Sequence, residues 1–258
     1  MKQILAPIVS NSEIIPDVHL IRIEAPQVAA EARPGQFITA CCGDDVLLRR
    51  PLSIHRIEEG QLALLFAVVG QGTAWLANRK QGESLDILGP LGNGFKVQQN
   101  THNILLVAGG IGIAPLVCLA EKAVDDGISV KLILGTATAT QHYSEVDGVE
   151  IIRVTEDGSL GEKGMVTDLL PSIAGWADQL FACGPISMYR TMAAMGTEIE
   201  GKSVQILLEQ VMGCGVGACR GCAIPTHQGM KMVCQNGPVF DLREIMWEQI
   251  TAPKIGQF

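Results

Sequence analysis

Four cysteines near the C-terminal end of the chain have a spacing that suits the binding of iron by sulfur. Three lie in "CGVGACRGC", as Cys214, Cys219 and Cys222, and Cys234 follows in "MVCQNGP". The pattern is C-x4-C-x2-C-x11-C, and its first three members are spaced as in plant-type [2Fe–2S] proteins. The intervening glycines let the chain wrap a cluster and bring N–H groups to its sulfurs. The pattern therefore favours a [2Fe–2S] electron relay held by these four residues.

Zinc is the alternative metal for this group, because tetrahedral sites with four cysteine ligands are common. Such sites usually pair two C-x2–4-C knuckles, whereas three of these cysteines crowd a single loop. The spacing therefore ranks zinc second. A zinc-bearing nucleotide sensor without enzymatic activity stays open as an alternative function at this point.

Composition places the chain among globular proteins with two or three small domains. It has 258 residues, 47% of them hydrophobic, and a formal net charge of −8. No run rich in Lys or Arg stands out, so we expect neither nucleic acid nor a membrane surface as a partner. The N-terminus carries no secretory signal pattern. We therefore expect a cytoplasmic protein whose eight cysteines serve metal or redox chemistry.

The chain divides into three regions of different texture. In residues 1–99, short strand-like runs alternate with turns, which predicts an antiparallel β-barrel. In residues 100–208, strands alternate with helices, which predicts a parallel α/β sheet that binds a nucleotide. Residues 209–258 hold the cysteines and little apolar material for a core of their own. The predicted fold is therefore multi-domain, with a small C-terminal iron–sulfur domain.

A glycine-rich turn, "AGGIGIAP", follows the first strand of the predicted α/β region. Gly109, Gly110 and Gly112 let main-chain N–H groups approach a phosphate at a helix N-terminus. Pro115 fits the first turn of that helix, where its missing N–H costs nothing. The turn is not G-x-G-x-x-G, and a tight strand–helix connection without a ligand is the alternative. Its position favours a dinucleotide pyrophosphate.

The segments after two later strands bear on the nucleotide. No Lys or Arg lies between Lys131 and Arg153 to hold a 2′-phosphate, which favours NAD over NADP. "FACGP" places Cys183 at the carboxyl end of a strand, where ligands of open α/β sheets bind. Cys183 is therefore a catalytic candidate beside the nicotinamide. A small buried thiol is the alternative for this residue.

Two segments of the predicted barrel carry groups that suit a flavin nucleotide. "RRPLSIHR" contains Arg50 for a diphosphate, the rigid Pro51, and the Ser53 hydroxyl for a ring nitrogen. "GQGT" adds Gly72 and Thr73. Taken alone, the first segment is better explained as an edge strand and the second as an ordinary turn.

In their order along the chain, these segments resemble the ferredoxin-reductase superfamily. The resemblance rests on the Arg-Pro-x-Ser strand, a Gly-Pro-Leu-Gly loop, the Gly-Gly-x-Gly-x-Ala-Pro turn and the Cys-Gly-Pro strand end. "CGVGACRGC…VCQNGPVF" and "TEDGSLGEKGMVTDLL" resemble, more narrowly, the electron-transfer subunits of NAD-dependent, two-subunit (B-type) dihydroorotate dehydrogenases. The resemblance covers nearly the whole chain.

The resemblance implies FAD in the barrel. By position, the flavin-binding residues are Arg50, Pro51, Leu52, Ser53, Ala67, Val68, Val69, Gly72 and Thr73. Two positions depart from the usual pattern. Leu52 stands where the superfamily often has Tyr, which removes an aromatic ring from the flavin. Asn236 stands where the family often has Asp, which removes a charge beside the cluster.

The resemblance also implies a partner and a direction of electron flow. An FMN-containing catalytic subunit, with which this chain forms a heterotetramer, oxidises dihydroorotate in pyrimidine (UMP) biosynthesis. Electrons then cross [2Fe–2S] and FAD to NAD⁺, and FAD links one-electron to two-electron transfer. No residue here resembles a base for dihydroorotate. The alternative is a flavin/iron–sulfur reductase subunit of another redox complex, of the hydrogenase or sulfide-oxidising type.

Overall fold

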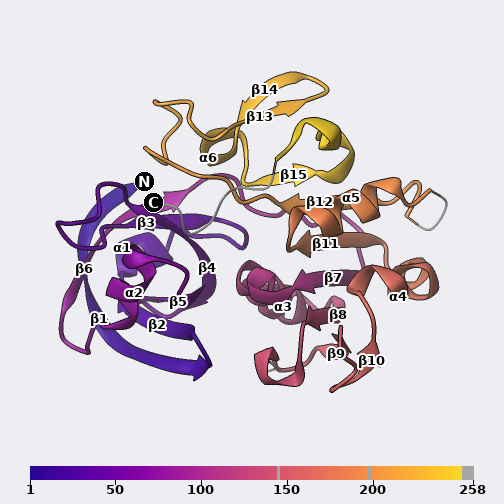
Figure 1. The fold of residues 1–258 in the computed structure, drawn as a ribbon, viewed down its shortest axis with the longest axis horizontal. Helices are drawn as coiled ribbons and strands as arrows, with labels where there is room; N and C mark the ends of the chain where they lie inside the picture. The colour runs from indigo at the N-terminus through magenta and orange to yellow at the C-terminus, as the bar shows by residue number, and fades with distance from the viewer. Residues whose placement is uncertain (144–145, 197–198, 252–258) are drawn as a thin grey trace.

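The computed structural model describes residues 1–143, 146–196 and 199–251, so the end of the predicted cluster domain, 252–258, lies outside the described residues. A β-barrel, a sheet flanked by helices and a C-terminal segment follow one another along the chain (Figure 1). The predicted boundaries fall in the connections after β6 and after β12. Within the described ranges, no helix is long and apolar enough to cross a membrane.

Six strands close the predicted antiparallel barrel in the order β1-β2-β5-β4-β3-β6. They are β1 (Lys2–Ile15), β2 (Val18–Glu24), β3 (Phe37–Ala40), β4 (Arg50–Glu58), β5 (Gln61–Ala67) and β6 (Ser84–Leu91). Two short helices, α1 (Pro26–Ala29) and α2 (Gln71–Ala77), follow β2 and β5. Inward-facing side chains such as Ile21, Ile54 and Leu64 are fully buried in the barrel core, because alternate residues of a strand point to opposite faces.

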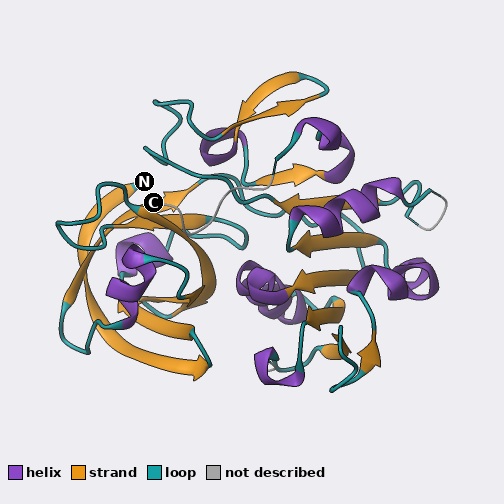
Figure 2. Ribbon diagram, viewed as in Figure 1, coloured by secondary structure: helices purple, strands orange, loops and turns teal. Residues whose placement is uncertain are grey.

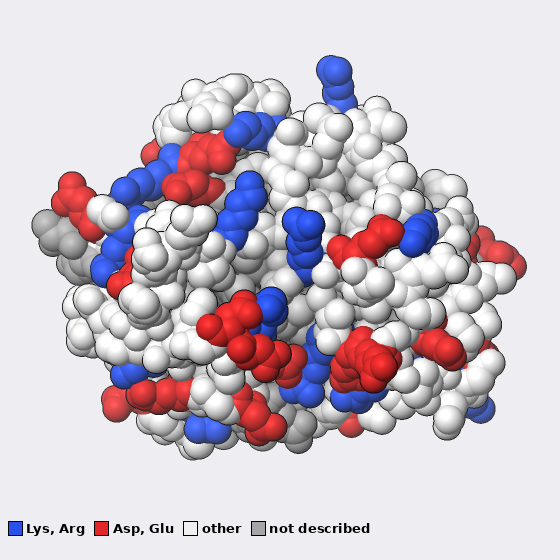
Figure 3. All heavy atoms as spheres, turned by 180° about the vertical axis from the view of Figure 1, so that it is seen from behind, with Lys and Arg blue, Asp and Glu red and all other residues white. Residues whose placement is uncertain are grey.

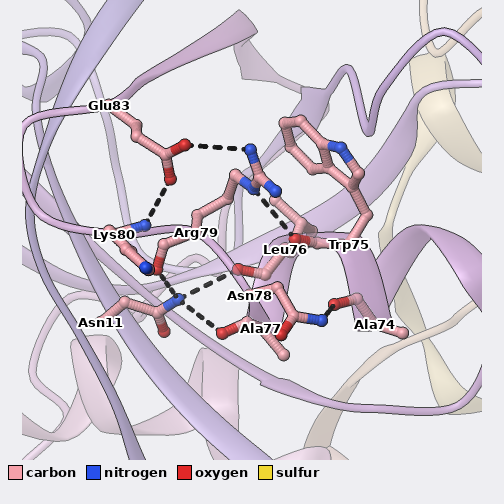
Figure 4. Close-up of polar contacts among 9 residues, drawn as sticks. All are labelled: Asn11, Ala74, Trp75, Leu76, Ala77, Asn78, Arg79, Lys80 and Glu83. Carbon is pink, nitrogen blue, oxygen red and sulfur yellow. Dashed lines mark hydrogen bonds and ion pairs between the residues drawn. The ribbon is translucent and has the colours of Figure 1, made fainter.

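Polar contacts fix the C-terminal end of α2 to the barrel (Figure 4). The side-chain amide of Asn11, on β1, donates to three main-chain carbonyls, those of Leu76, Ala77 and Arg79. The Arg79 guanidinium lies 4.1 Å from the centre of the Trp75 ring and 3.1 Å from Glu83 Oε1. These contacts hold in place the helix whose first turn carries the predicted flavin residues.

A seven-stranded sheet follows in the order β10-β9-β8-β7-β11-β12-β15. The strands are β7 (Asn103–Gly109), β8 (Ser129–Thr136), β9 (Glu150–Thr155), β10 (Glu162–Lys163), β11 (Gln179–Cys183), β12 (Ser203–Leu207) and β15 (Val239–Asp241). Neighbours are parallel except β12 and β15, which are antiparallel. The sheet is therefore the predicted parallel α/β sheet, with an antiparallel edge strand contributed by the C-terminal segment.

Helices cover both faces of this sheet (Figure 2). They are α3 (Ile113–Asp125) on the barrel side, and α4 (Val166–Ile173) and α5 (Ile186–Ala194) on the other. Short 3-10 segments are η1 (Gly110–Gly112), η2 (Ala139–Gln141), η3 (Ala174–Trp176), η4 (Leu242–Glu244) and η5 (Trp247–Gln249). The central strand β7 is buried on both faces: Leu106 packs in the α3 core and Leu105 in the opposite core. That explains its continuous apolar sequence.

The C-terminal segment packs against both other parts. It contains β13 (Ala223–Thr226), β14 (Gly229–Met232) and α6 (Val233–Asn236), ahead of β15. Its Val233 and Phe240 share a core with Phe37 and Leu91 of the barrel. A segment with few apolar residues is thus stabilised by cores that the rest of the chain supplies.

The surface carries charges of both signs. On the face drawn in Figure 3, Lys and Arg side chains are interspersed with Asp and Glu. The sequence likewise has no run of Lys and Arg, although its formal net charge is −8.

Candidate functional site

The four predicted cluster cysteines lie together as two pairs. Cys222 Sγ is 3.3 Å from Cys234 Sγ, and the Cys219 main-chain nitrogen is 3.4 Å from Cys214 Sγ. Among the described residues, no three Cys, His, Asp or Glu side chains are placed to hold one metal ion. A two-iron cluster needs two thiolates at each iron, whereas zinc needs all four around one ion. The paired arrangement therefore suits the cluster better than zinc.

Main-chain N–H groups point at the sulfurs. The donors are Val216 and Cys219 to Cys214, Gly217 to Cys234, Gly221 to Cys219, and Cys234 to Cys222, at 3.1–3.4 Å. Burial raises the pKa of Cys214, but the hydrogen bonds from Cys219 and Val216 outweigh it and lower that pKa to about 6. Such donors favour a thiolate, which is the form that binds a metal.

Close packing explains two glycines of the cysteine loop. Gly217 has a φ of +82°, and a Cβ there would lie 2.6 Å from Gln235 Oε1. Gly215 has a φ of +72°, and a Cβ there would lie 2.9 Å from Cγ2 of Thr39 on β3. Both positions need a residue without a side chain. The loop is therefore pressed directly against the barrel.

The two cysteine pairs differ in exposure. Cys222 and Cys234 are 1% and 3% exposed and belong to the core shared with the barrel, whereas Cys219 is exposed. Asn93, just after β6, fixes the buried side: its main-chain nitrogen donates to Gly237 O at 2.6 Å, and its side chain to Asn236 O at 2.8 Å. Cys222 and Cys234 are thus buried, Cys214 is half-buried, and Cys219 is exposed.

Arg50 and Gly72, two of the predicted flavin residues, lie against each other on the barrel. Arg50, on β4, lies against the first turn of α2, where a Cβ at Gly72 would be 2.7 Å from Arg50 Nε. A guanidinium held there by a missing Cβ fits a diphosphate. Pro51 and Ser53 pair with Thr39 and Phe37 of β3, and all four are on the outer face.

Thr73, Val69 and Leu52 occupy different parts of the barrel surface and core. The Thr73 hydroxyl accepts from the N–H groups of Val69 and Gly70, so it shapes the loop that follows Ala67 and Val68 at the end of β5. Val69 is 51% exposed, as a contact for a flat ring requires. Leu52 is buried in the barrel core, so its side chain points away from the face that bears Pro51.

A cleft of about 520 Å³ opens at the carboxyl ends of β7, β8 and β11. The sheet order reverses here, because β7 is flanked by β8 on one side and β11 on the other. Ligands of open α/β sheets bind at such a switch point. The lining includes Gly109, Gly110, Gly112, Thr136, Ala137, Gln141, Glu156, Cys183, Gly184 and Glu209.

The residues of the glycine turn have different roles, because some face the cleft and others pack against neighbouring elements. Gly110 has a φ of +55°, and a Cβ there would meet no atom within 4 Å, so it faces open space. A Cβ at Gly112 would lie 2.1 Å from the Cys183 carbonyl oxygen, so this glycine lets the turn after β7 pack against the end of β11. Pro115 is buried in the first turn of α3 and does not line the cleft.

The structure brings Cys183 into the cleft wall as a neutral thiol. Burial raises its pKa well above the usual value, and the nearby Glu209 carboxylate adds to that effect. The adjacent Tyr189 hydroxyl accepts from Gly184 N at 2.9 Å and donates to Leu207 O at 2.6 Å. This hydroxyl fixes the strand end that carries Cys183.

Sequence reasoning missed two carboxylates of the cleft. Glu209 follows β12, and although it is exposed to the cleft, the surrounding protein raises its pKa by desolvation. Glu156 follows β9, on the opposite side of the cleft near Ala137. Each directly follows a predicted strand, and this position at the carboxyl end of a strand could have indicated a ligand-binding residue. Among the described lining residues there is no Lys or Arg.

Comparison with known proteins agrees with this arrangement. Residues 209–246 match the family described as the iron–sulfur cluster binding domain of dihydroorotate dehydrogenase B. The electron transfer subunit of dihydroorotate dehydrogenase B (NAD(+)) from Desulforamulus reducens is 37% identical over 249 residues, covering 91% of this chain and 95% of that protein. The Bacillus cereus subunit is 37% identical over 253 residues, covering 93% and 96%.

The chain belongs to this family of electron transfer subunits. The resemblance to these electron-transfer subunits that the sequence indicated is therefore confirmed over nearly the whole chain. Asn236, which stands where the resemblance implied an Asp, accepts from Met232 N at 2.9 Å through its Oδ1. The amide thus supports the turn of α6 next to Cys234.

Solved structures show the same fold. The structure reported for an NADH-dependent reduced ferredoxin-NADP oxidoreductase matches with a TM-score of 0.86 and 31% identity, covering 95% of this chain and 91% of that one. A ferredoxin NADP⁺ reductase from Neisseria gonorrhoeae with bound FAD and NADP matches with a TM-score of 0.63 and 19% identity, covering 76% and 92%. The second likeness concerns the reductase fold alone.

Proposed function

We propose that this electron transfer subunit carries electrons from a dihydroorotate-oxidising partner to NAD⁺. The partner is the FMN-containing catalytic subunit, in a heterotetramer that serves pyrimidine biosynthesis. The observation that carries the proposal is the contact between the cysteine loop and β3, the strand paired with Pro51 of the flavin face. Electron transfer requires neighbouring redox sites, and this contact makes the two candidate sites neighbours.

The cysteine site is the point of entry. Cys219 is exposed, where a partner can approach, whereas Cys214 is half-buried and Cys222 and Cys234 are buried. The N–H groups around the four sulfurs stabilise negative charge on them. A [2Fe–2S] cluster supplies one-electron transfer when bound there.

The outer barrel face is the flavin site. Arg50 binds the diphosphate of FAD, with Gly72 leaving room for the guanidinium. The Ser53 hydroxyl donates to the ring system, and the exposed Val69 packs against it. FAD supplies the conversion between one-electron and two-electron transfer when bound there.

The cleft at the switch point receives the dinucleotide. Main-chain N–H groups near Gly110 bind the pyrophosphate, and the cleft wall between Cys183 and Glu209 orients the nicotinamide. Glu156 accepts hydrogen bonds from the adenosine ribose and repels a 2′-phosphate, which makes NAD the nucleotide. In balance, dihydroorotate loses two electrons and two protons, and NAD⁺ takes both electrons with one of those protons.

A second candidate is a reductase subunit in another redox complex. It is favoured by the likeness to the NADH-dependent reduced ferredoxin-NADP oxidoreductase structure, at 31% identity over nearly the same length. The cysteine loop and cleft described above serve that function equally well. The identity of the partner therefore separates the two candidates.

The test is co-expression of the chain with a family catalytic subunit from the same genome. The purified pair is assayed for dihydroorotate-dependent reduction of NAD⁺, with absorption spectra and iron content measured on the same sample. We expect a stable complex, flavin and cluster bands, and turnover. A chain that carries FAD and iron yet does not bind the catalytic subunit would instead support the second candidate.

A further inference from the structure

Thr39 carries a buried hydroxyl that no other described residue satisfies. The residue is 2% exposed, and among the described residues its Oγ1 has no hydrogen-bond partner. Buried polar side chains in native proteins nearly always have a partner, because burying a hydroxyl without one is unfavourable. The hydroxyl therefore needs a partner other than the described residues.

The position of Thr39 lies between the two candidate redox sites. On one side it pairs across β3 and β4 with Pro51, so its side chain shares the outer face with the flavin residues. On the other side its Cγ2 lies 2.9 Å from where a Cβ of Gly215 would be. Oγ1 branches from the same Cβ as that methyl group, so the hydroxyl lies next to this contact. Gly215 directly follows Cys214.

We propose that the Thr39 hydroxyl donates a hydrogen bond to a sulfur of the [2Fe–2S] cluster. The inference rests on the proposed function, because it needs the cluster to be present. Main-chain N–H groups already approach the cysteine sulfurs from the loop itself. Thr39 adds a donor from the barrel, on the side that faces the flavin.

A donor at this place tunes the cluster. Reduction adds negative charge to the iron–sulfur core, and a hydrogen bond to sulfur stabilises the more negative form. The hydroxyl therefore raises the reduction potential of the cluster. Thr39 is a positioning and tuning residue, since it contributes no ligand to iron.

The experiment is a redox titration of the intact complex, followed by the electron paramagnetic resonance signal of the reduced cluster. Thr39→Val keeps the shape of the side chain and removes the donor, so the cluster potential should fall. Thr39→Ser keeps a hydroxyl and should titrate near the wild-type potential. Thr226→Val is the matched control, because that buried hydroxyl already donates to Gly229 O at 2.7 Å within its own hairpin. It should leave the potential unchanged.

Each outcome decides between support and rejection. A fall in the cluster potential with Val, but not with Ser, supports the proposal. An unchanged cluster potential with Val, or a shift confined to the flavin, overturns it. If Thr39→Val does not take up iron, Thr39→Ala replaces it in the titration with the same expected fall. A wild-type chain without iron would reject the proposed function itself, so the two failures are distinguishable.

Discussion

His55 Nδ1 lies 2.8 Å from the carbonyl oxygen of Ala114. This contact joins β4, the strand of the flavin residues, to the first turn of α3, the helix that begins at the dinucleotide cleft. The carbonyl can only accept, so Nδ1 carries the proton, and Nε2 faces the Tyr143 hydroxyl at 3.4 Å. Beside it, Arg56 and Glu121 form an ion pair at 3.1 Å between the same two elements. The neutral imidazole thus holds the barrel against the α/β sheet.

This contact predicts a loss of stability in acid. Burial lowers the pKa of His55 from 6.5 to about 4, so the unfolded chain takes up a proton first as the pH falls. The stabilisation is complete above pH 6.5 and is lost between there and about 4, up to about 3 kcal/mol. His55→Gln should remove this part of the pH dependence of the unfolding free energy. Chemical denaturation at several pH values checks it, with the exposed His227→Gln as the control. Equal pH slopes for His55→Gln and the wild type would contradict the assignment.

Glu156 should set the choice of nucleotide. Its carboxylate lines the end of the cleft formed by β8 and β9, where a 2′-phosphate would be repelled. Glu156→Gln should raise kcat/KM for NADPH by roughly tenfold, about 1.4 kcal/mol, with little change for NADH. Steady-state dye reduction with both nucleotides measures this. Glu162→Gln, an exposed carboxylate on β10, is the control. The assignment fails if the NADPH preference is the same in both variants.

Glu209 should act at the opposite end of the cleft. Its carboxylate faces the wall that contains Cys183, and desolvation raises its pKa. Glu209→Ala should lower kcat/KM for NADH by about tenfold, the effect of losing one hydrogen bond to the nicotinamide. Glu209→Gln should keep part of the rate. Flavin and iron contents are measured alongside, and full activity of the Ala variant would refute a role in positioning.

The parts of this protein that could be predicted from the sequence are those encoded locally. Cys214, Cys219 and Cys222 lie on one loop, so their spacing alone indicates a shared site. The strand–turn–helix at Gly110 likewise uses consecutive residues, and its glycines line the cleft. The alternation of strands and helices was sufficient to predict the parallel sheet.

The parts that could not be predicted depend on tertiary contacts. The barrel order β1-β2-β5-β4-β3-β6 is not the chain order, so nothing local places Thr39 beside Gly215. Glu209 and Glu156 meet one cleft only because their strands end at the same edge of the sheet. Pro115 lies in the first turn of α3 and does not line the cleft, whereas Gly112 both lines the cleft and packs on Cys183.

The chain on its own should oxidise NADH with an artificial electron acceptor, and it should not oxidise dihydroorotate. The sequence offers no base for a pyrimidine, and the lining of the cleft is explained by a dinucleotide. Purified without a partner, it should transfer electrons from NADH to ferricyanide and show no orotate formation from dihydroorotate. Liquid chromatography of the products measures this. Orotate formed by the single polypeptide would contradict its role as a carrier subunit.

The most direct test of the electron relay is Cys219→Ser in the complex with its catalytic subunit. Serine removes a soft thiolate from the exposed cysteine pair, so the cluster should be lost or impaired. Cys118→Ala, a buried thiol in α3, is the control. We measure dihydroorotate-dependent NAD⁺ reduction alongside NADH–dye activity, iron content and complex formation. The account predicts a fall of at least about 100-fold in the first activity, since even changes around metal ligands cost roughly 10–100-fold, with dye activity retained. An iron-free variant that still binds its partner and reduces NAD⁺ at the wild-type rate would show that the four cysteines are not the relay.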